Sequence, residues 1–167
     1  MRATVRGVSR LDDLRRVEQA LVRISRISNG RVAARYRTQR AGVVLSRPAI
    51  TILTELRESG PVRLSLLARL TDLEAPLISR EVRELSGVGY VRRTADPTDG
   101  RAGIVELTPE GRSAIHSYRE ATDEIISETF AGWGENDLRD LSVLLDRVSE
   151  DFARSPDRVE RGLHSAS

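Results

Sequence analysis

The segment that decides the fold is a basic stretch near the middle of the chain, Tyr90-Val91-Arg92-Arg93-Thr94-Ala95-Asp96-Pro97-Thr98-Asp99-Gly100-Arg101-Ala102-Gly103-Ile104-Val105-Glu106-Leu107-Thr108. Residues 90–94 and 102–107 have the composition of two short strands, and they flank a group of turn-forming residues. Asp96-Pro97 and Asp99-Gly100 favour turns, because Pro fixes one φ angle and Gly accepts positive φ without steric cost. The stretch therefore predicts a β-hairpin whose tip projects from the body of the protein and carries Arg101.

The tip of this hairpin has the chemistry of a nucleic-acid contact, although it does not establish one. The guanidinium of Arg101, with Asp99 close enough to orient it, suits a narrow groove lined with negative charge. Most Asp-Gly hairpins, however, only connect two strands. The sequence that precedes the hairpin therefore decides between the two interpretations.

That preceding sequence has the pattern of two short helices joined by a turn. Residues 65–71 predict a helix with three leucines at helical spacing, Leu66, Leu67 and Leu70. A turn over residues 72–74 follows. Pro76 then lies where Pro is tolerated, in the first turn of a second helix that extends to about Ser86.

The second helix is amphipathic. Three apolar residues repeat at intervals of four and three, which predicts one buried stripe: Ile78, Val82 and Leu85. The other side carries one hydroxyl and two guanidinium groups: Ser79, Arg80 and Arg83. A helix of about three turns with such a face fits the major groove of DNA. Gly87 and Gly89 are predicted to end it and to lead into the hairpin.

The order of these motifs resembles the MarR family of bacterial winged-helix transcription regulators. The resemblance rests on the segments Leu77-Ile78-Ser79-Arg80, Leu85, Gly89-Tyr90-Val91, Asp99-Gly100-Arg101-Ala102 and Leu107-Thr108-Pro109-Glu110-Gly111. The signature of the family's wing is Asp-x-Arg-(Ala/Ser), followed a few residues later by Leu-Thr, and this chain matches it at the right spacing.

The resemblance implies that Arg101 enters the minor groove, that Asp99 braces it, and that the helix beginning near Pro76 lies in the major groove. The expected DNA contacts are Pro76, Leu77, Ser79, Arg80, Arg83, Arg93, Asp99 and Arg101. Two positions depart from the family pattern: Glu74 replaces a small hydroxyl N-cap, and Ala75 replaces a common Gln. An acid near a helix start still suits the helix dipole. The missing Gln could have read a base, so the operator sequence does not follow from relatives.

The composition limits the class of protein. The chain has 167 residues, of which 39% are hydrophobic and 4% aromatic, which predicts one globular domain with an aliphatic core. Cysteine is absent, which excludes disulfides and thiol-based redox sensing. No apolar run approaches the roughly 20 residues that span a bilayer, and no apolar region follows the basic N-terminus as in a secretory signal. We therefore expect a cytoplasmic protein without a membrane partner.

Charge is distributed unevenly along the chain. Residues 1–61 carry 13 Arg against 5 acidic residues, whereas residues 104–167 carry 7 against 14. This asymmetry fits two alternatives: the two ends pack together, or they are solvated helix faces of opposite bias. Residues 62–103 carry 7 Arg against 6 acids and are nearly neutral. This near-neutrality keeps open the alternative of a winged-helix module that binds proteins instead of DNA. A small-molecule-binding protein is a further alternative.

The segments on either side of the reading region are predicted to be helical. Residues 9 to about 38 predict one long helix, with a capping box at Ser9-Arg10-Leu11-Asp12 and a slight kink at Gly30. Residues 47–58 predict a helix capped by Ser46. The short run 62–64 predicts a third strand beside the hairpin.

Two further helices follow the wing. Thr108-Pro109-Glu110 is a strong helix start, and this helix should extend to about Phe130. After Gly132-Trp133-Gly134, residues 135–153 predict a last helix whose apolar residues form a narrow seam of the coiled-coil kind. The terminal helices therefore predict a homodimer whose interface includes Leu11, Leu14, Val17, Leu138, Leu141, Leu145 and Val148.

The residues needed for catalysis are missing. The two His residues, His116 and His164, are predicted to lie on a surface or interface and in the tail. The chain has no Cys for a nucleophile or a thiolate zinc site, and no Gly-rich phosphate loop. The acids of the last third follow the spacing of solvated helix faces. We expect no enzyme activity, no cofactor and no metal.

Together these features predict a mainly α protein with a small β-hairpin wing (α+β), a winged helix-turn-helix with N- and C-terminal dimerisation helices. The single domain 1–167 divides into dimerisation helices at 9–40 and 109–153, a winged-helix part at 45–108 and a flexible tail at 154–167. The expected function is a regulator, commonly a repressor in such families, that binds a pseudo-palindromic operator in double-stranded DNA as a homodimer. The resemblance also suggests a small-molecule effector, for which Tyr36, Tyr118 and Trp133 are the only cues.

Overall fold

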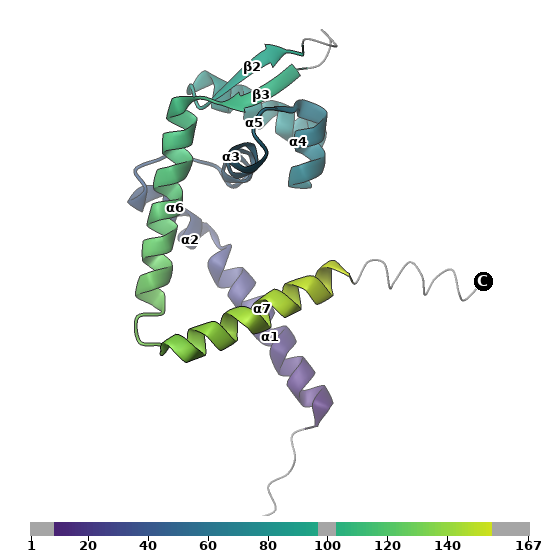
Figure 1. The fold of residues 1–167 in the computed structure, drawn as a ribbon, viewed down its shortest axis with the longest axis vertical. Helices are drawn as coiled ribbons and strands as arrows, with labels where there is room; N and C mark the ends of the chain where they lie inside the picture. Colours follow the sequence, from purple (N-terminus) through teal and green to yellow (C-terminus); the bar gives the residue numbers. More distant parts are fainter. Residues whose placement is uncertain (1–8, 97–102, 155–167) are drawn as a thin grey trace, which may run out of the picture. The chain divides into compact units, whose positions relative to one another are not determined.

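The computed structural model describes residues 9–96 and 103–154, so Asp99, Arg101 and His164 lie outside the described residues. Within the described part the chain is mainly helical, with one small sheet (Figure 1). The helices are α1 (Arg10–Ser28), α2 (Arg31–Arg40), α3 (Arg47–Ser59), α4 (Leu64–Thr71), α5 (Ala75–Gly87), α6 (Pro109–Thr129) and α7 (Glu135–Ala153). The strands are β1 (Val62–Arg63), β2 (Val91–Ala95) and β3 (Gly103–Leu107). The chain forms two compact units, residues 1–125 and 126–167, which we describe separately.

The sheet is antiparallel and has the order β1-β3-β2. The predicted third strand is confirmed, because Val62 pairs with Val105 of β3, although Leu64 already belongs to α4. On the other side of β3, Val91 pairs with Leu107. The four paired residues, Val62, Val105, Val91 and Leu107, are buried, and the sheet therefore presents an apolar face to the helices.

The core of the first unit lies between this sheet and α3, α4 and α5, which gather on one side of it in Figure 1. Its largest fully buried side chains are Ile52, Leu53, Leu67, Ile78, Val105 and Ile115. The predicted buried stripe of α5 is confirmed, since Ile78, Val82 and Leu85 are all in this core. Of the three leucines at helical spacing in α4, Leu67 is buried, whereas Leu66 and Leu70 are 36% and 46% exposed.

The prediction of one long N-terminal helix with a slight kink is wrong, because α1 and α2 are separate helices. Asn29 follows α1 with φ −102° and ψ 3°, and Gly30 precedes α2 in an extended conformation. The guanidinium of Arg37 donates a hydrogen bond to the carbonyl oxygen of Ser28 at 2.8 Å. This carbonyl lies at the C-terminal end of α1, and in a continuous helix it would have accepted from a backbone amide in the next turn. The predicted capping box at Ser9 and Asp12 is confirmed.

The other helix ends follow local signals. The hydroxyl of Ser46 accepts from the Ala49 amide at 3.0 Å and caps α3, and the hydroxyl of Thr108 accepts from the Gly111 amide at 3.0 Å at the start of α6. The prediction that Gly87 and Gly89 end the second helix and lead into the hairpin is confirmed, because Gly87 is the last residue of α5. Gly89, with φ 78°, makes the turn into β2.

The second unit contains the end of α6 and all of α7. Phe130 and Trp133 pack edge to face, with ring centroids 5.2 Å apart, where the chain turns between the two helices. On α7, Leu138, Leu141 and Val148 are half-buried, whereas Leu145 is 42% exposed. No helix among the described residues is long and apolar enough to cross a membrane.

Candidate nucleic-acid interface

Helices α4 and α5 form a helix-turn-helix. The turn depends on Asp72, which ends α4 in the left-handed region with φ 51°, a conformation that Asp adopts more readily than most residues. The amide of Leu73 then donates to the carbonyl of Ala68 at 3.3 Å. Pro76 lies in the first turn of α5, as predicted, but Glu74 makes no side-chain cap.

The outward face of α5 is the one that the sequence predicts. Pro76, Arg80 and Arg83 are exposed, and Leu77 and Ser79 are half-buried at the border of this face. The 13 residues of α5 make a rod about 20 Å long, at 1.5 Å per residue. A major groove is about 12 Å wide and admits an α-helix, so α5 can present this face to the base edges.

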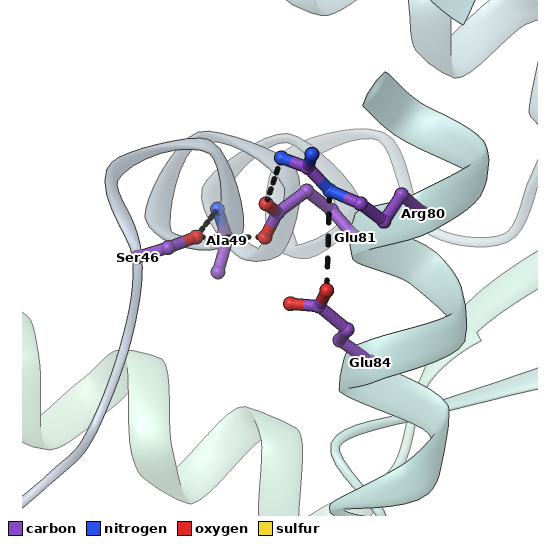
Figure 2. A network of polar contacts seen from close by, with 5 residues as sticks. All are labelled: Ser46, Ala49, Arg80, Glu81 and Glu84. Atoms are coloured by element: carbon purple, nitrogen blue, oxygen red, sulfur yellow. Dashed lines mark hydrogen bonds and ion pairs between the residues drawn. The ribbon is translucent and has the colours of Figure 1, made fainter. Parts of the chain in front are cut away.

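A buried carboxylate on the inward face was not predicted. Glu81 is 4% exposed, and its Oε2 accepts from the hydroxyl of Ser46 at 2.7 Å (Figure 2). Because that hydroxyl also caps α3 at Ala49, one side chain joins the start of α3 to the middle of α5. The available signal was the position of Glu81 beside Ile78, Val82 and Leu85, inside the apolar stripe.

The same network holds Arg80. Its guanidinium lies 3.4 Å from Glu81 Oε1 and 3.9 Å from Glu84 Oε1, as Figure 2 shows. The Arg80 side chain is 61% exposed. The pair with Glu84 joins two exposed side chains and contributes about 0–1 kcal/mol, so a phosphate or a base can replace Glu84 at small cost.

Three of the predicted contact residues lie around one groove. Its volume is about 560 Å³, and its lining residues are Leu64, Ser79, Val82, Arg83, Ser86, Gly87 and Arg93. Arg83 belongs to α5 and Arg93 to β2, so the groove joins the recognition helix to the base of the wing. Neither guanidinium makes an ion pair or hydrogen bond with another residue of the described part. The neighbouring Arg92, in contrast, pairs with Glu106 at 2.8 Å.

The root of the wing is held by an ion pair that was also not predicted. Arg63 of β1 reaches Asp96, just after β2, with 2.5 Å between Nε and Oδ2. The Asp96 side chain is only 5% exposed, whereas that of Arg63 is 49% exposed. The sequence indicated Asp96 only as a turn former. The tip beyond it, residues 97–102, lies outside the described residues, so the roles of Asp99 and Arg101 stay predictions.

A second set of contacts fixes the start of α6 to the link between α5 and β2. The hydroxyl of Thr108 lies 2.7 Å from the carbonyl oxygen of Gly89 and 3.1 Å from that of Tyr90. A Cβ on Gly111 would lie 2.8 Å from the carbonyl carbon of Tyr90, so only glycine allows this close approach. Recognition helix, wing and the first turn of α6 are therefore held together.

The candidate ligand residues have different surroundings. Tyr118 of α6 is partly buried against the core. Tyr36 of α2 is 50% exposed, and its hydroxyl lies 3.3 Å from Arg40 Nη1. Arg40 also pairs with Glu124 of α6 at 2.9 Å, which joins a basic N-terminal segment to an acidic C-terminal one. His116 is on the surface, 3.3 Å from Glu120, and no cluster of metal-binding side chains occurs in residues 9–96 and 103–154.

Known proteins share this architecture. The model of the MarR family matches residues 45–102, from just before α3 to the wing. The crystal structure of a probable transcriptional regulator from Pseudomonas aeruginosa is 32% identical and covers 79% of this chain and 98% of its own, with a TM-score of 0.63. This chain belongs to the MarR family. The resemblance that the wing signature indicated is therefore confirmed, and with it the winged helix-turn-helix fold.

Two further similar proteins have lower sequence identity to this chain. An uncharacterised helix-turn-helix regulator of Bacillus subtilis, YxaD, is 26% identical over 108 residues, which are 65% of this chain and 76% of that protein. The structure of the PcaV regulator of Streptomyces coelicolor, in complex with its natural ligand, is 18% identical. It covers 90% of this chain and 98% of its own, with a TM-score of 0.54, and it shows a shared fold.

Proposed function

We propose that this MarR-family regulator reads double-stranded DNA with α5 in a major groove and the wing in the adjacent minor groove. One observation carries the proposal: Arg83 and Arg93, without carboxylate partners in the described part, line one groove with Ser79. Two free guanidiniums along one groove suit the phosphate backbone, which binds Arg strongly.

The contacts divide between base edges and phosphates. Pro76, Leu77, Ser79 and Arg80 occupy the N-terminal half of α5, the part of a recognition helix that meets the bases. Arg83 and Arg93 lie further back and take backbone phosphates. Arg101, braced by Asp99, completes the half-site in the minor groove.

A homodimer supplies the second half-site. The apolar seam of α1 is largely exposed, at 56% for Leu11, 56% for Leu14 and 50% for Val17, and none of its residues is buried. Burying apolar surface yields about 25 cal/mol per Å², so such a seam favours a partner. We expect the apolar residues of α7 to belong to the dimer interface as well: Leu138, Leu141, Leu145 and Val148.

Two-fold symmetry then predicts a pseudo-palindromic operator with half-sites about one helical turn, roughly 34–36 Å, apart. A dimer that covers such a site in a promoter excludes RNA polymerase, so we infer repression as the mode of regulation. The protein would work in the cytoplasm, where bacterial DNA is found.

A small effector is the remaining part of the proposal. The relative PcaV was solved with its natural ligand. In this chain Tyr36 and Tyr118 lie on α2 and α6, which Arg40 and Glu124 connect. A ligand that binds there would favour one spacing of the two recognition helices and so weaken operator binding.

The test is selection of bound fragments from the parent genome at fixed salt, followed by titration of the selected duplex at several salt concentrations. A DNA reader should lose affinity steeply as salt rises. A protein-interaction module should bind no duplex at all, and a small-molecule carrier should bind its ligand without any effect on DNA. Either result would contradict the proposal.

A further inference from the structure

Arg93 occupies an unusual position in the sheet. Because opposite residues of paired strands point to the same face, Val91 and Leu107, Arg93 and Val105, and Ala95 and Gly103 share one face. That face covers the core, since Val91, Val105 and Leu107 are at most 5% exposed. Arg93 is the first residue of β2 beyond the core on this face, and its side chain reaches the groove beside α5.

Gly103 provides the space in which the Arg93 guanidinium lies. A Cβ on Gly103 would be 2.9 Å from Arg93 Nη2, 3.0 Å from Cζ and closer still to Nε. Real Cβ atoms essentially never approach so closely. The guanidinium therefore occupies the volume that the side chain of any other residue would fill.

The backbone does not explain this glycine. Among the described residues, the glycines with positive φ are Gly42, Gly60 and Gly89, so Gly103 has a conformation that other residues adopt. Glycine in a strand weakens the strand, and it often marks a close approach by another group. Here the approaching group is the Arg93 guanidinium.

We propose that Gly103 is a positioning residue for DNA binding, because its missing side chain keeps Arg93 against β3 and facing the groove that Arg83 lines. The inference rests on the proposed function, and it concerns one backbone phosphate held by Arg93. Replacing Gly103 by Ala would push away the end of a flexible side chain and leave the backbone in place. The fold would persist, and the phosphate contact would be lost.

The test is a double-mutant cycle with Gly103→Ala, Arg93→Ala and the double variant, on a selected duplex and on an unrelated one. We expect each single variant to bind both duplexes about 3- to 10-fold more weakly, because a phosphate contact carries no sequence information. The slope of log affinity against log salt should fall by about 0.9. The double variant should bind no more weakly than Arg93→Ala, since Gly103 acts through Arg93.

Two controls accompany the cycle. Gly132→Ala is the matched substitution, because its Cβ would meet no atom within 4 Å, and it should bind DNA like the unchanged protein. The Tm of Gly103→Ala should equal or exceed that of the unchanged protein, because Ala suits a strand better than Gly. A large drop in Tm would show that the fold, not Arg93, needs this glycine, and would overturn the inference.

Other outcomes also decide. Unchanged affinity for Gly103→Ala, or losses that add fully in the double variant, would show that Gly103 does not act through Arg93 while the proposed function stands. Failure of the unchanged protein to bind any duplex would contradict the proposed function itself, and the role of Gly103 would fall with it.

Discussion

At the scale of residues, the four Arg side chains of α5 and β2 differ in what holds them. Arg80 and Arg92 have carboxylate partners, whereas Arg83 and Arg93 have none in the described part and share a groove. The near-neutral charge of residues 62–103 therefore understates their capacity to bind phosphate, because the acids neutralise particular Arg residues and leave others free. Placement, not net charge, supports the DNA-binding proposal.

The tip of the wing gives the first prediction. Arg101→Ala should weaken operator binding by roughly 1–3 kcal/mol, because a guanidinium in a narrow minor groove would be lost. Fluorescence anisotropy with the selected duplex measures the change, and circular dichroism and sedimentation should show an intact fold and dimer. If affinity is unchanged, the wing tip has no part in recognition.

The buried carboxylate gives the second. Ser46→Ala should lower the free energy of unfolding by about 2–4 kcal/mol, because it removes a helix cap and leaves Glu81 short of a hydrogen-bond donor. Ser9→Ala is the matched control: it removes an exposed cap without a buried partner and should cost about 1 kcal/mol or less. Urea unfolding compares them, and equal losses would show that Glu81 contributes nothing.

At the scale of elements, the wing depends on its root. Asp96→Ala removes the carboxylate that pairs with Arg63 across the sheet, and because Arg63 is half-exposed and can be rehydrated, the loss of stability should be about 1–2 kcal/mol. DNA affinity should fall several-fold while the salt dependence stays unchanged, because no phosphate contact is removed. Glu106→Gln, which breaks the exposed pair with Arg92 on the same sheet, is the control and should change little. A reduced salt dependence for Asp96→Ala would instead indicate a lost phosphate contact.

The elements also show which features a sequence can reveal. The starts of α3, α5 and α6 follow from Ser46, Pro76 and Thr108, because caps and prolines act within one turn of the helix. The sequence predicts only a kink between α1 and α2, because the hydrogen bond from Arg37 to the Ser28 carbonyl forms only after the chain has turned and leaves no local signal. The Ser46 partner of Glu81 and the space beside Gly103 depend on residues distant in sequence and on strand register. Spacing along the chain cannot supply either.

At the scale of the whole molecule, affinity and assembly are linked. A single recognition surface with few free guanidiniums offers limited binding energy, and a dimer that places two of them on one duplex adds their contributions. The exposed seam of α1 is therefore as important to the proposed function as the groove beside α5. Its apolar residues have no other evident use in the monomer, where none of them is buried.

This link gives the last prediction. Leu14→Glu should leave the Tm of the winged-helix part nearly unchanged, because Leu14 is 56% exposed, but it should place a charge in the expected interface. Sedimentation should then show a monomer, and operator affinity should fall at least 100-fold, as expected when one of two linked sites is lost. Val44→Glu, at a residue 97% exposed and outside the seam, should remain dimeric and bind normally. If the Leu14→Glu protein stays dimeric, the interface does not include this part of α1. If it is monomeric and still binds the operator with full affinity, DNA binding does not require the dimer.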